Sequence, residues 1–562
     1  MRRLVTAPRH VAHVAHLDIR SARRQTAGRV TRFRFLLCLL PPVVVGSLLR
    51  FHRLGEQVLL GDELHAVRAV SAMPLGEILT TYAERDHGLP LAGFYRAASS
   101  LGPIDETVLR APVLIAGLLL LVLAPWLLRK RIGAPAAVLL AWLVAVSPAL
   151  TLYSRIARPY MPVVLLSFLA VIAFHAWLES GARSSAVAYA VCASLAMYTH
   201  LVSAPFVLAP FVFLAGAYLT PLRSRLPPLA RAIVLGLLTL VLILVWLLPS
   251  APSLIELVSL KRGRGAIDPT ALPDVLRLQL GTRALPIAAM LAAAAVLGWI
   301  RLLQRDAVWG SYVLTVLVVN AIGLVLLSPQ RFGEPIILSR YLLLTLPFTL
   351  AGVAMALAPE SVAVSTPVRW VTRGLVAAAV VALVATGPFV DPVYARSSFV
   401  HHNDFVDFTK PKATRAADAI PGFYLDLAHE SGTAAIIEAP CDARWDYTRA
   451  YYVYQGVHGR PVRLSCPSHA SAVDFRRFRP KTLLPPTPEA FLASGAEWVV
   501  VHDDLPGEEA DTSPPRVGSA LDVSLLRGAA ASLSSELRTA WGPPDVAADT
   551  VEVWDLRRVR GG

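Results

Sequence analysis

Long apolar segments recur along most of this 562-residue chain, and they constrain its fold more than any other feature. About 20 apolar residues are enough for a helix to cross the hydrocarbon core of a bilayer. Only 16% of the residues are charged, whereas a soluble protein usually has about a quarter. We therefore expect a mainly α protein, with a polytopic transmembrane helical bundle over residues 33–390. The expected spans are 33–50, 107–128, 134–153, 157–178, 185–201, 203–220, 230–248, 285–302, 309–327, 341–358 and 370–388.

Basic residues set the expected orientation of these spans. The net charge is +14, and much of it lies in a basic tail, residues 1–32. In a soluble chain this charge would suggest a nucleic-acid partner, but here the cytoplasmic excess of Lys and Arg explains it. With the tail inside, the basic loops Arg129–Arg131, Pro221–Arg231 and Arg301–Asp306 also fall inside. We therefore expect a multi-pass plasma-membrane protein with a cytoplasmic N-terminus, a lipid bilayer as partner and no nucleic acid.

The same orientation places four loops outside, namely 51–106, 154–160, 249–284 and 328–340. The segment Gly88–Gly102 is apolar but short, and it carries Arg96 in its middle. We expect a re-entrant or interfacial helix there, although a second short crossing nearby would also preserve the orientation. The expected number of spans is therefore about 11 to 13.

The composition changes near Asp391, where charged residues and Pro become more frequent and apolar runs of spanning length end. Strand-like segments such as Thr433–Pro440 alternate with helix-like ones over 391–562. This alternation predicts a small α/β domain, extracytoplasmic in the expected topology. Cys441 and Cys466 lie in this domain and are a candidate disulfide if it is outside the cytosol. The sequence alone does not fix their pairing.

Ionisable residues gather in the expected outer loops and are scarce in the spans. Such residues inside spans mark ion paths and proton relays, so their scarcity argues against a transport path. His175 is the main candidate for such a role, and we interpret it as structural. The polar clusters are GDELHAVR (Gly61–Arg68), YAERDHGLPL (Tyr82–Leu91), YSRIARPY (Tyr153–Tyr160) and QRFGEPIILSRY (Gln330–Tyr341). We expect these four loops to form one site at the outer membrane surface.

The residue types in these loops suit transfer of a group from a lipid phosphate. The carboxylates of Asp62, Glu63 and Asp86 can accept a proton from a hydroxyl or amine. Arg158 and Arg340 have the planar guanidinium that binds phosphate oxygens. Stabilising the charge on a leaving lipid phosphate would be a large part of the catalysis.

Each of these residues also has a structural interpretation. Asp62 can cap a helix, and the two arginines can anchor spans at the interface. Asp86 and His87 can shape a turn before Gly88, although His87 can also donate or take a proton. Adjacent residues of a helix diverge by about 100°, so Asp62 and Glu63 cannot both point at one atom if this segment is helical.

In these loops the chain resembles the GT-C glycosyltransferases of the protein O-mannosyltransferase and aminoarabinose-transferase type. The acidic pair Asp62 and Glu63 follows the first span, as in that family. RDHGLPL, with Asp86 and His87, resembles the family's D-x-H-P-P-L element with the first Pro replaced.

Two later elements extend the resemblance to about residue 350. S-x-E-A-R-x-Y is matched by Arg158 and Tyr160, with Ile156 in place of the family's Glu. S-P-R-Y-L-L-x-x-L-P is matched by LSRYLLLTLP, which contains Arg340 and Tyr341.

This resemblance implies a transferase that moves a hexosyl or pentosyl group from a polyprenyl- or dolichyl-phosphate sugar to an envelope glycan, lipid or protein. The high content of Ala, Arg and Pro suggests a GC-rich bacterium, in which the protein would lie in the inner membrane. The resemblance implies Asp62 as the catalytic residue and the C-terminal domain as acceptor-binding. We assign Asp62, Glu63 and Asp86 to catalysis and predict neither a cofactor nor metal ligands; assistance by a divalent metal stays open. The expected donor-binding residues are His87, Arg158, Tyr160, Arg340 and Tyr341. A transporter or flippase of a lipid-linked precursor and a non-catalytic scaffold are the alternatives.

Overall fold

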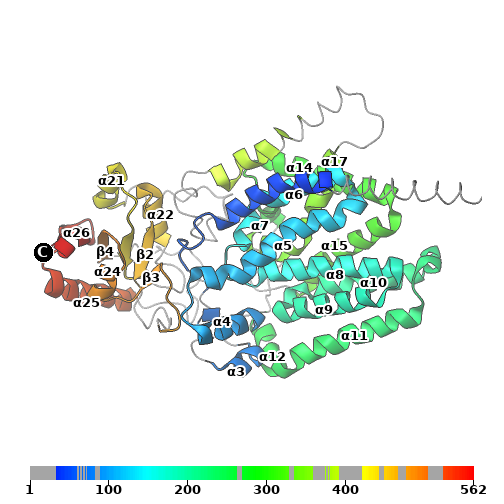
Figure 1. Ribbon diagram of the computed structural model, residues 1–562, viewed down its shortest axis with the longest axis horizontal. Helices are drawn as coiled ribbons and strands as arrows, with labels where there is room; N and C mark the ends of the chain where they lie inside the picture. The colour runs from blue at the N-terminus through cyan, green and yellow to red at the C-terminus, as the bar shows by residue number, and fades with distance from the viewer. Residues whose placement is uncertain are drawn as a thin grey trace, which may run out of the picture.

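The computed structural model shows a long helical bundle with a small α/β domain at one end (Figure 1). This confirms the expected fold class, a mainly α membrane bundle with a C-terminal α/β domain. The structure describes residues 33–59, 63, 66–67, 70, 73–82, 89–261, 269–327, 335–358, 374, 377–378, 380–390, 420–441, 449–465, 476–503 and 523–561.

Within the described residues, eight helices are long and apolar enough to cross a membrane, and each coincides with an expected span. They are Phe33–Phe51, Glu106–Ile132, Tyr160–Ser180, Leu201–Tyr218, Leu229–Ser259, Leu285–Arg305, Ala307–Leu327 and Pro335–Leu357. Their principal elements are α5 (Glu106–Ile132), α8 (Tyr160–Ser180), α10 (Ala204–Tyr218), α11 (Leu229–Leu247), α14 (Leu285–Arg305), α15 (Ala307–Leu327), α16 (Pro335–Leu342) and α17 (Leu346–Leu357).

The expected span 134–153 is instead a broken pair of helices, α6 (Ala134–Ala145) and α7 (Pro148–Tyr153). The break has a local cause, because Ser147 caps the second helix by accepting a hydrogen bond from the Leu150 N–H at 3.4 Å. Pro148 follows at the first helical position, where its missing N–H costs nothing. The expected span 185–201 is α9 (Arg183–Thr199), and the described part of 370–388 is also helical.

Close approach of backbones holds part of the bundle together. A Cβ added to Gly298 of α14 would lie 1.8 Å from the carbonyl oxygen of Gly352 in α17, so neither position has room for a side chain. Small residues at helix contacts allow this packing in membranes, where lipid tails remove the hydrophobic drive for helix association. Aromatic rings fill the wider contacts; Phe174 of α8 stacks on Tyr312 of α15 with centroids 5.8 Å apart.

The basic loops meet at the end of the bundle that lies away from the α/β domain. Arg131, in the last turn of α5, lies 3.1 Å from Asp306 between α14 and α15, and it also pairs with Glu179 of α8. Its guanidinium is 3.3 Å from the ring nitrogen Nδ1 of His175. His175 therefore belongs to a cluster that joins helices at this end, which agrees with its structural interpretation.

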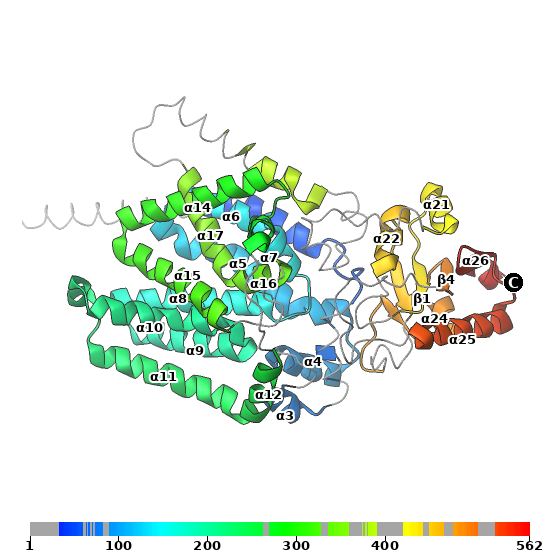
Figure 2. The ribbon, with the colours of Figure 1, turned by 180° about the vertical axis from the view of Figure 1, so that it is seen from behind.

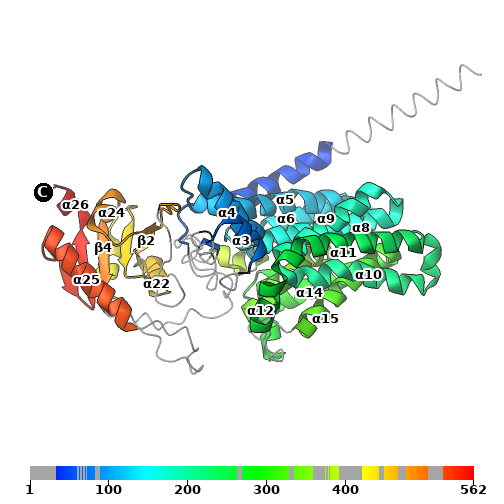
Figure 3. The same cartoon turned by 90° about the horizontal axis from the view of Figure 1, so that it is seen from below.

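Short helices surround the opposite end of the bundle. They are α3 (Leu75–Thr80), α4 (Leu89–Leu101), α12 (Ala251–Lys261) and α13 (Leu272–Leu280). α4 has 13 residues, too few to span a bilayer, and it exposes Phe94 and Leu101 while burying Tyr95. Figures 2 and 3 show α3 and α4 beside the α/β domain. The described part of the expected segment 88–102 is thus a short helix, Leu89–Leu101, at this end of the molecule.

The C-terminal domain contains a six-stranded sheet in the order β3-β2-β1-β4-β6-β5. β3, β2, β1 and β4 are parallel, and β6 and β5 add antiparallel strands at one edge. The strands are β1 (Ile436–Ala439), β2 (Val462–Ser465), β3 (Leu483–Leu484), β4 (Trp498–His502), β5 (Val546–Ala548) and β6 (Val551–Asp555). The helices are α21 (Gly422–His429), α22 (Arg449–His458), α24 (Pro488–Ala493), α25 (Val523–Trp541) and α26 (Leu556–Gly561).

A buried polar network lies on one face of this sheet. The Tyr424 hydroxyl donates to Glu438 Oε2 at 2.7 Å, and His502 Nε2 is 2.9 Å from the same oxygen. Tyr454 stacks on Tyr424 with centroids 4.5 Å apart. His458 is buried beside this stack, and its burial, with the nearby Arg460 charge second, lowers the pKa of the imidazole to about 3.

Because the buried His458 imidazole is held neutral, the free energy of unfolding of the C-terminal domain should fall in acid. Because the folded state keeps this imidazole neutral down to about pH 3, only the unfolded chain takes up the proton as the pH falls below about 6.5. This group alone should therefore reduce the free energy of unfolding by up to about 1.4 kcal/mol per pH unit in that window. His458→Gln should flatten the dependence in thermal unfolding between pH 7.5 and 5. Substituting the exposed His429 with Gln is the control and should leave it unchanged.

Candidate functional site

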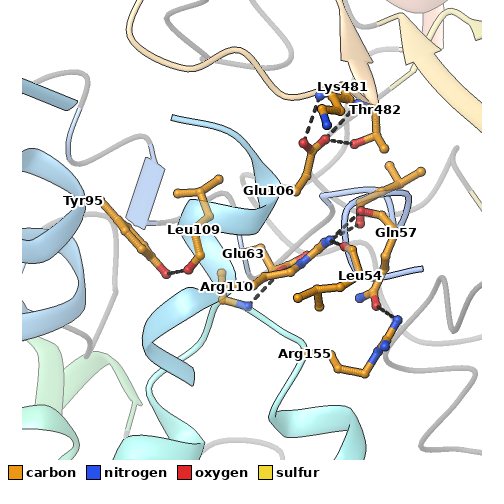
Figure 4. A network of polar contacts seen from close by, with 12 residues as sticks. Leu54, Gln57, Glu63, Tyr95, Glu106, Leu109, Arg110, Arg155, Lys481 and Thr482 are labelled. Carbon is orange, nitrogen blue, oxygen red and sulfur yellow. Dashed lines mark hydrogen bonds and ion pairs between the residues drawn. The ribbon is translucent and has the colours of Figure 1, made fainter. Parts of the chain in front are cut away.

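The loop after the first helix is built on buried arginines. Arg110, in the first turns of α5, is fully buried and donates to the carbonyl oxygens of Leu54 and Gln57, at 2.7 Å each (Figure 4). A guanidinium has five N–H donors in a fixed plane, so one side chain can hold several carbonyls at once. The carbonyls of this loop thereby satisfy their hydrogen bonds away from water.

Arg155 and Arg50 join the same loop to the turn between α7 and α8. Arg155 donates to the carbonyl oxygens of Leu49 at 3.1 Å and Arg50 at 2.8 Å, and to Gln57 Oε1 at 3.3 Å. In return, Arg50 Nε donates to Ser154 Oγ at 3.2 Å. Burial, and then the charges of Arg110 and Arg50, lower the pKa of Arg155 to about 9. These exchanged contacts fix the turn at 154–158 against the C-terminal end of the first helix.

Glu63 is part of this buried framework. Its two carboxylate oxygens accept hydrogen bonds from Arg110 Nε and Nη2 at 3.1 and 3.0 Å. Oε1 also accepts the Ala157 N–H at 2.7 Å, and only 4% of the residue is exposed. Glu63 thus holds the loop and the turn together, and the catalytic role that we predicted for it stays a prediction.

The helix that contains Glu63 buries one face. Glu63, Ala66, Val67 and Val70 are helical and buried, at positions i, i+3, i+4 and i+7. Asp62 lies outside the described residues. Glu63, the next residue in the chain, accepts the N–H of Ala157, which precedes Arg158. The polar loops Gly61–Arg68 and Tyr153–Tyr160 are therefore joined at this point.

Asp86 and His87 also lie outside the described residues. The residues on either side of their segment, Tyr82 and Leu89, share a hydrophobic cluster with Tyr198 at the end of α9. The Tyr198 hydroxyl donates to the Leu79 carbonyl at 2.9 Å and so holds α3 against α9. These contacts anchor the second polar loop, Tyr82–Leu91, to the end of α9 at Tyr198. His200 follows two residues later in the chain.

The two predicted phosphate-binding arginines meet at one tyrosine. Arg340 of α16 donates from Nη1 to the Tyr160 hydroxyl at 3.2 Å, and its Cζ is 5.3 Å from the centre of the Tyr160 ring. Arg158 Cζ is 6.0 Å from the same ring. Tyr160 and Arg158 are buried. The structure thus brings Arg158, Tyr160 and Arg340 together from loops about 180 residues apart in the chain.

His200 belongs to the same cluster and was missed by the sequence analysis. Its ring is 5.6 Å from that of Tyr160 and 6.3 Å from that of Tyr341. Nδ1 accepts the Val202 N–H at 3.2 Å, which leaves Nε2 as the N–H donor of a neutral ring. The available signal was a single His at the outer end of the expected span 185–201, outside every polar loop motif.

The cluster is chemically an anion site. Two guanidinium groups, a phenol and an imidazole N–H are all hydrogen-bond donors, and the arginines suit phosphate geometry. Ile156 stands where the family motif S-x-E-A-R-x-Y has its Glu. It is 2% exposed and packs in the bundle core. That position therefore does not supply a carboxylate to the cluster.

Cys441, at the end of β1, is disulfide-bonded. Its candidate partner Cys466 lies outside the described residues. Cys38 and Cys192, in the bundle, are free thiols.

Comparison with known proteins gives similarities of overall fold. No protein-family model and no curated protein matches the chain. ArnT from Cupriavidus metallidurans in the apo state is 14% identical with a TM-score of 0.45, over 82% of this chain and 92% of that one. Its structure bound to undecaprenyl phosphate has the same identity and coverage and a TM-score of 0.42. The Archaeoglobus fulgidus oligosaccharyltransferase is 14% identical with a TM-score of 0.40, over 82% of this chain and 67% of that one. The resemblance to GT-C glycosyltransferases that the sequence motifs suggested stays a prediction.

Removing the Glu63 carboxylate should destabilise the fold. Glu63→Ala leaves the buried Arg110 without its ion-pair partner and Ala157 without its acceptor, which typically costs about 3–5 kcal/mol. Glu63→Gln keeps an acceptor and should lie between Ala and wild type. Thermal unfolding in lipid nanodiscs measures this order. The control is Glu56→Ala, which removes an exposed partner of Arg53 and should change stability by about 1 kcal/mol or less.

Proposed function

We propose that this protein is an integral-membrane glycosyltransferase. It transfers a sugar from a polyprenyl-phosphate donor to an acceptor in the cell envelope, at the outer face of the membrane. The observation that carries the proposal is the convergence of Arg158 and Arg340 on Tyr160, beside the turn that Glu63 joins to the Asp62 loop. A cluster of cationic side chains near a carboxylate-bearing loop suits attack at a carbon whose leaving group is a phosphate.

The cationic cluster holds the phosphate of the donor. Arg158 and Arg340 supply charge-assisted hydrogen bonds, which strengthen as negative charge develops on the departing oxygen. His200 adds a neutral N–H donor, and Tyr341 lies against its ring. Tyr160 fixes the relative position of the two guanidinium groups.

The reaction is a single displacement in this proposal. The Asp62 carboxylate takes the proton of an acceptor hydroxyl as the acceptor oxygen bonds to the anomeric carbon of the sugar. The bond from that carbon to the phosphate oxygen breaks, and its electron pair leaves with the lipid phosphate. Attack opposite the leaving group inverts the anomeric configuration. Asp86 and His87 are expected to contact the sugar or the acceptor.

Two features support placing the site on the non-cytoplasmic side. The basic loops lie at the opposite end of the bundle, where the Arg131 cluster joins three helix ends, and Lys and Arg favour the cytoplasmic side. The disulfide at Cys441 suits an oxidising compartment. The C-terminal domain is then extracytoplasmic, and the location is the inner membrane of a bacterium.

Asp62→Asn should abolish or strongly reduce transfer, because the amide cannot accept the acceptor proton. We expect a fall of about a hundredfold or more in kcat, in line with the loss of a general base. Transfer is measured in nanodiscs with a panel of synthetic polyprenyl-phosphate hexoses and pentoses and an envelope extract as acceptor. Asp426→Asn, an exposed substitution in α21, is the control for loss of an acidic side chain. Full activity of Asp62→Asn at matched protein levels would remove Asp62 from the mechanism.

Arg340→Gln should weaken donor use specifically. Loss of one charged donor to a developing oxyanion typically lowers the rate by about 10²–10³, so kcat/KM for the lipid donor should fall by this factor. Arg231→Gln removes an exposed arginine at the opposite end of the bundle and should leave kcat/KM unchanged. Unaltered donor kinetics in Arg340→Gln would contradict the phosphate-binding role.

A further inference from the structure

The C-terminal domain forms a continuous structure with the catalytic loop of the bundle. Ile104, just before α5, pairs as a β-bridge with Phe478, between β2 and β3. The Ile104 N–H donates to the Arg477 carbonyl at 3.0 Å, and the Arg479 N–H donates to the Ile104 carbonyl at 2.9 Å. The two parts of the chain therefore share backbone hydrogen bonds.

A buried carboxylate strengthens this joint. Glu106, at the start of α5, is fully buried and accepts the N–H groups of Lys481 and Thr482 at 2.9 and 2.8 Å (Figure 4). It also accepts the Thr482 hydroxyl. Three donors from one short segment neutralise a charge that would be costly to bury alone. The segment Arg477–Thr482 is thus fixed to the same helix that carries Arg110.

The same segment reaches the helix that follows Asp62. Arg477 Nη1 donates to the Val70 carbonyl at 3.2 Å. Val67, Val70, Ile104 and Phe478 are at most 3% exposed and belong to one hydrophobic cluster. The described helical residues of this stretch are therefore held at one end by Glu63 and at the other, Val70, by a side chain of the C-terminal domain.

We infer that the side chain of Arg477 is a positioning element of the catalytic site. It acts through Val70 on the described helical residues of this stretch, Glu63, Ala66, Val67 and Val70, which directly follow the proposed base Asp62 in the chain. This inference rests on the proposed function for its catalytic consequence, whereas the structural link to residues 63–70 does not. A displacement of about 1 Å at a reacting group can cost a hundredfold in rate, so a distant clamp has a large effect.

The test compares Arg477→Ala, Arg477→Lys and Arg479→Ala in the full-length protein in nanodiscs. Arg479 lies two residues further on and is exposed, so its substitution removes the same charge and leaves the Arg477–Val70 contact in place. We expect Arg477→Ala to lower kcat by about tenfold or more while KM for a polyprenyl-phosphate sugar stays within about twofold. Lys should restore much of the rate, and Arg479→Ala should resemble wild type.

Hydrogen–deuterium exchange of residues 63–70 gives a readout that does not require transfer. Arg477→Ala should accelerate exchange there by about tenfold, with Lys restoring protection and the exchange of α14 unchanged as a sign of intact folding. Unchanged exchange in Arg477→Ala, or an equal increase in Arg479→Ala, would overturn the inference. If wild type transferred no sugar from any donor, the proposed function would fail while the exchange result still decided the structural link.

Discussion

The buried ion pair of Arg110 and Glu63 is the interaction on which the outer end of this protein depends. Removing two charges from water costs several kcal/mol for each ion, and their mutual attraction rarely repays it alone. Here the guanidinium also binds the carbonyls of Leu54 and Gln57, and the carboxylate also binds the Ala157 N–H. The pair therefore stabilises the fold mainly by connecting three backbone segments, and less by its own ionic attraction. It fixes the loop after the first helix, the start of α5 and the turn before α8 in one geometry.

The candidate site follows from that junction. The turn at 154–158 presents Arg158 directly after the residue bonded to Glu63, and α8 begins two residues later with Tyr160. Arg340 of α16, which is 180 residues later in the chain, donates a hydrogen bond to Tyr160. Two like charges near one ring are stable only in a rigid surrounding, and the exchanged contacts of Arg50 and Arg155 supply it. Arginines thus have two uses at this site. Arg50, Arg110 and Arg155 hold the backbone, and Arg158 and Arg340 are placed to hold a ligand.

The sequence predicted the spans well because bilayer thickness fixes the length of an apolar helix. It also predicted that Arg158, Tyr160 and Arg340 would meet, since polar loops on one side of a membrane share a narrow layer. It did not predict that Glu63 pairs with Arg110. Arg110 lies inside the expected span 107–128, and a pairing across 47 residues leaves no local pattern. His200 was missed for a similar reason, because one polar residue at the end of an apolar span has no periodic signature. The broken helix at Ser147 was readable in principle, since a Ser before a Pro commonly starts a helix.

The guanidinium groups of Arg158 and Arg340 beside Tyr160 also have a consequence for the last step of a turnover, the release of the lipid phosphate. A pocket that stabilises a departing lipid phosphate binds that phosphate equally well once the sugar has gone, so the spent carrier becomes a competitive inhibitor of the next donor. Release of the carrier into the bilayer, rather than bond breaking, is then a natural slow step. An enzyme built in this way would be governed by how quickly the membrane recycles its used lipid.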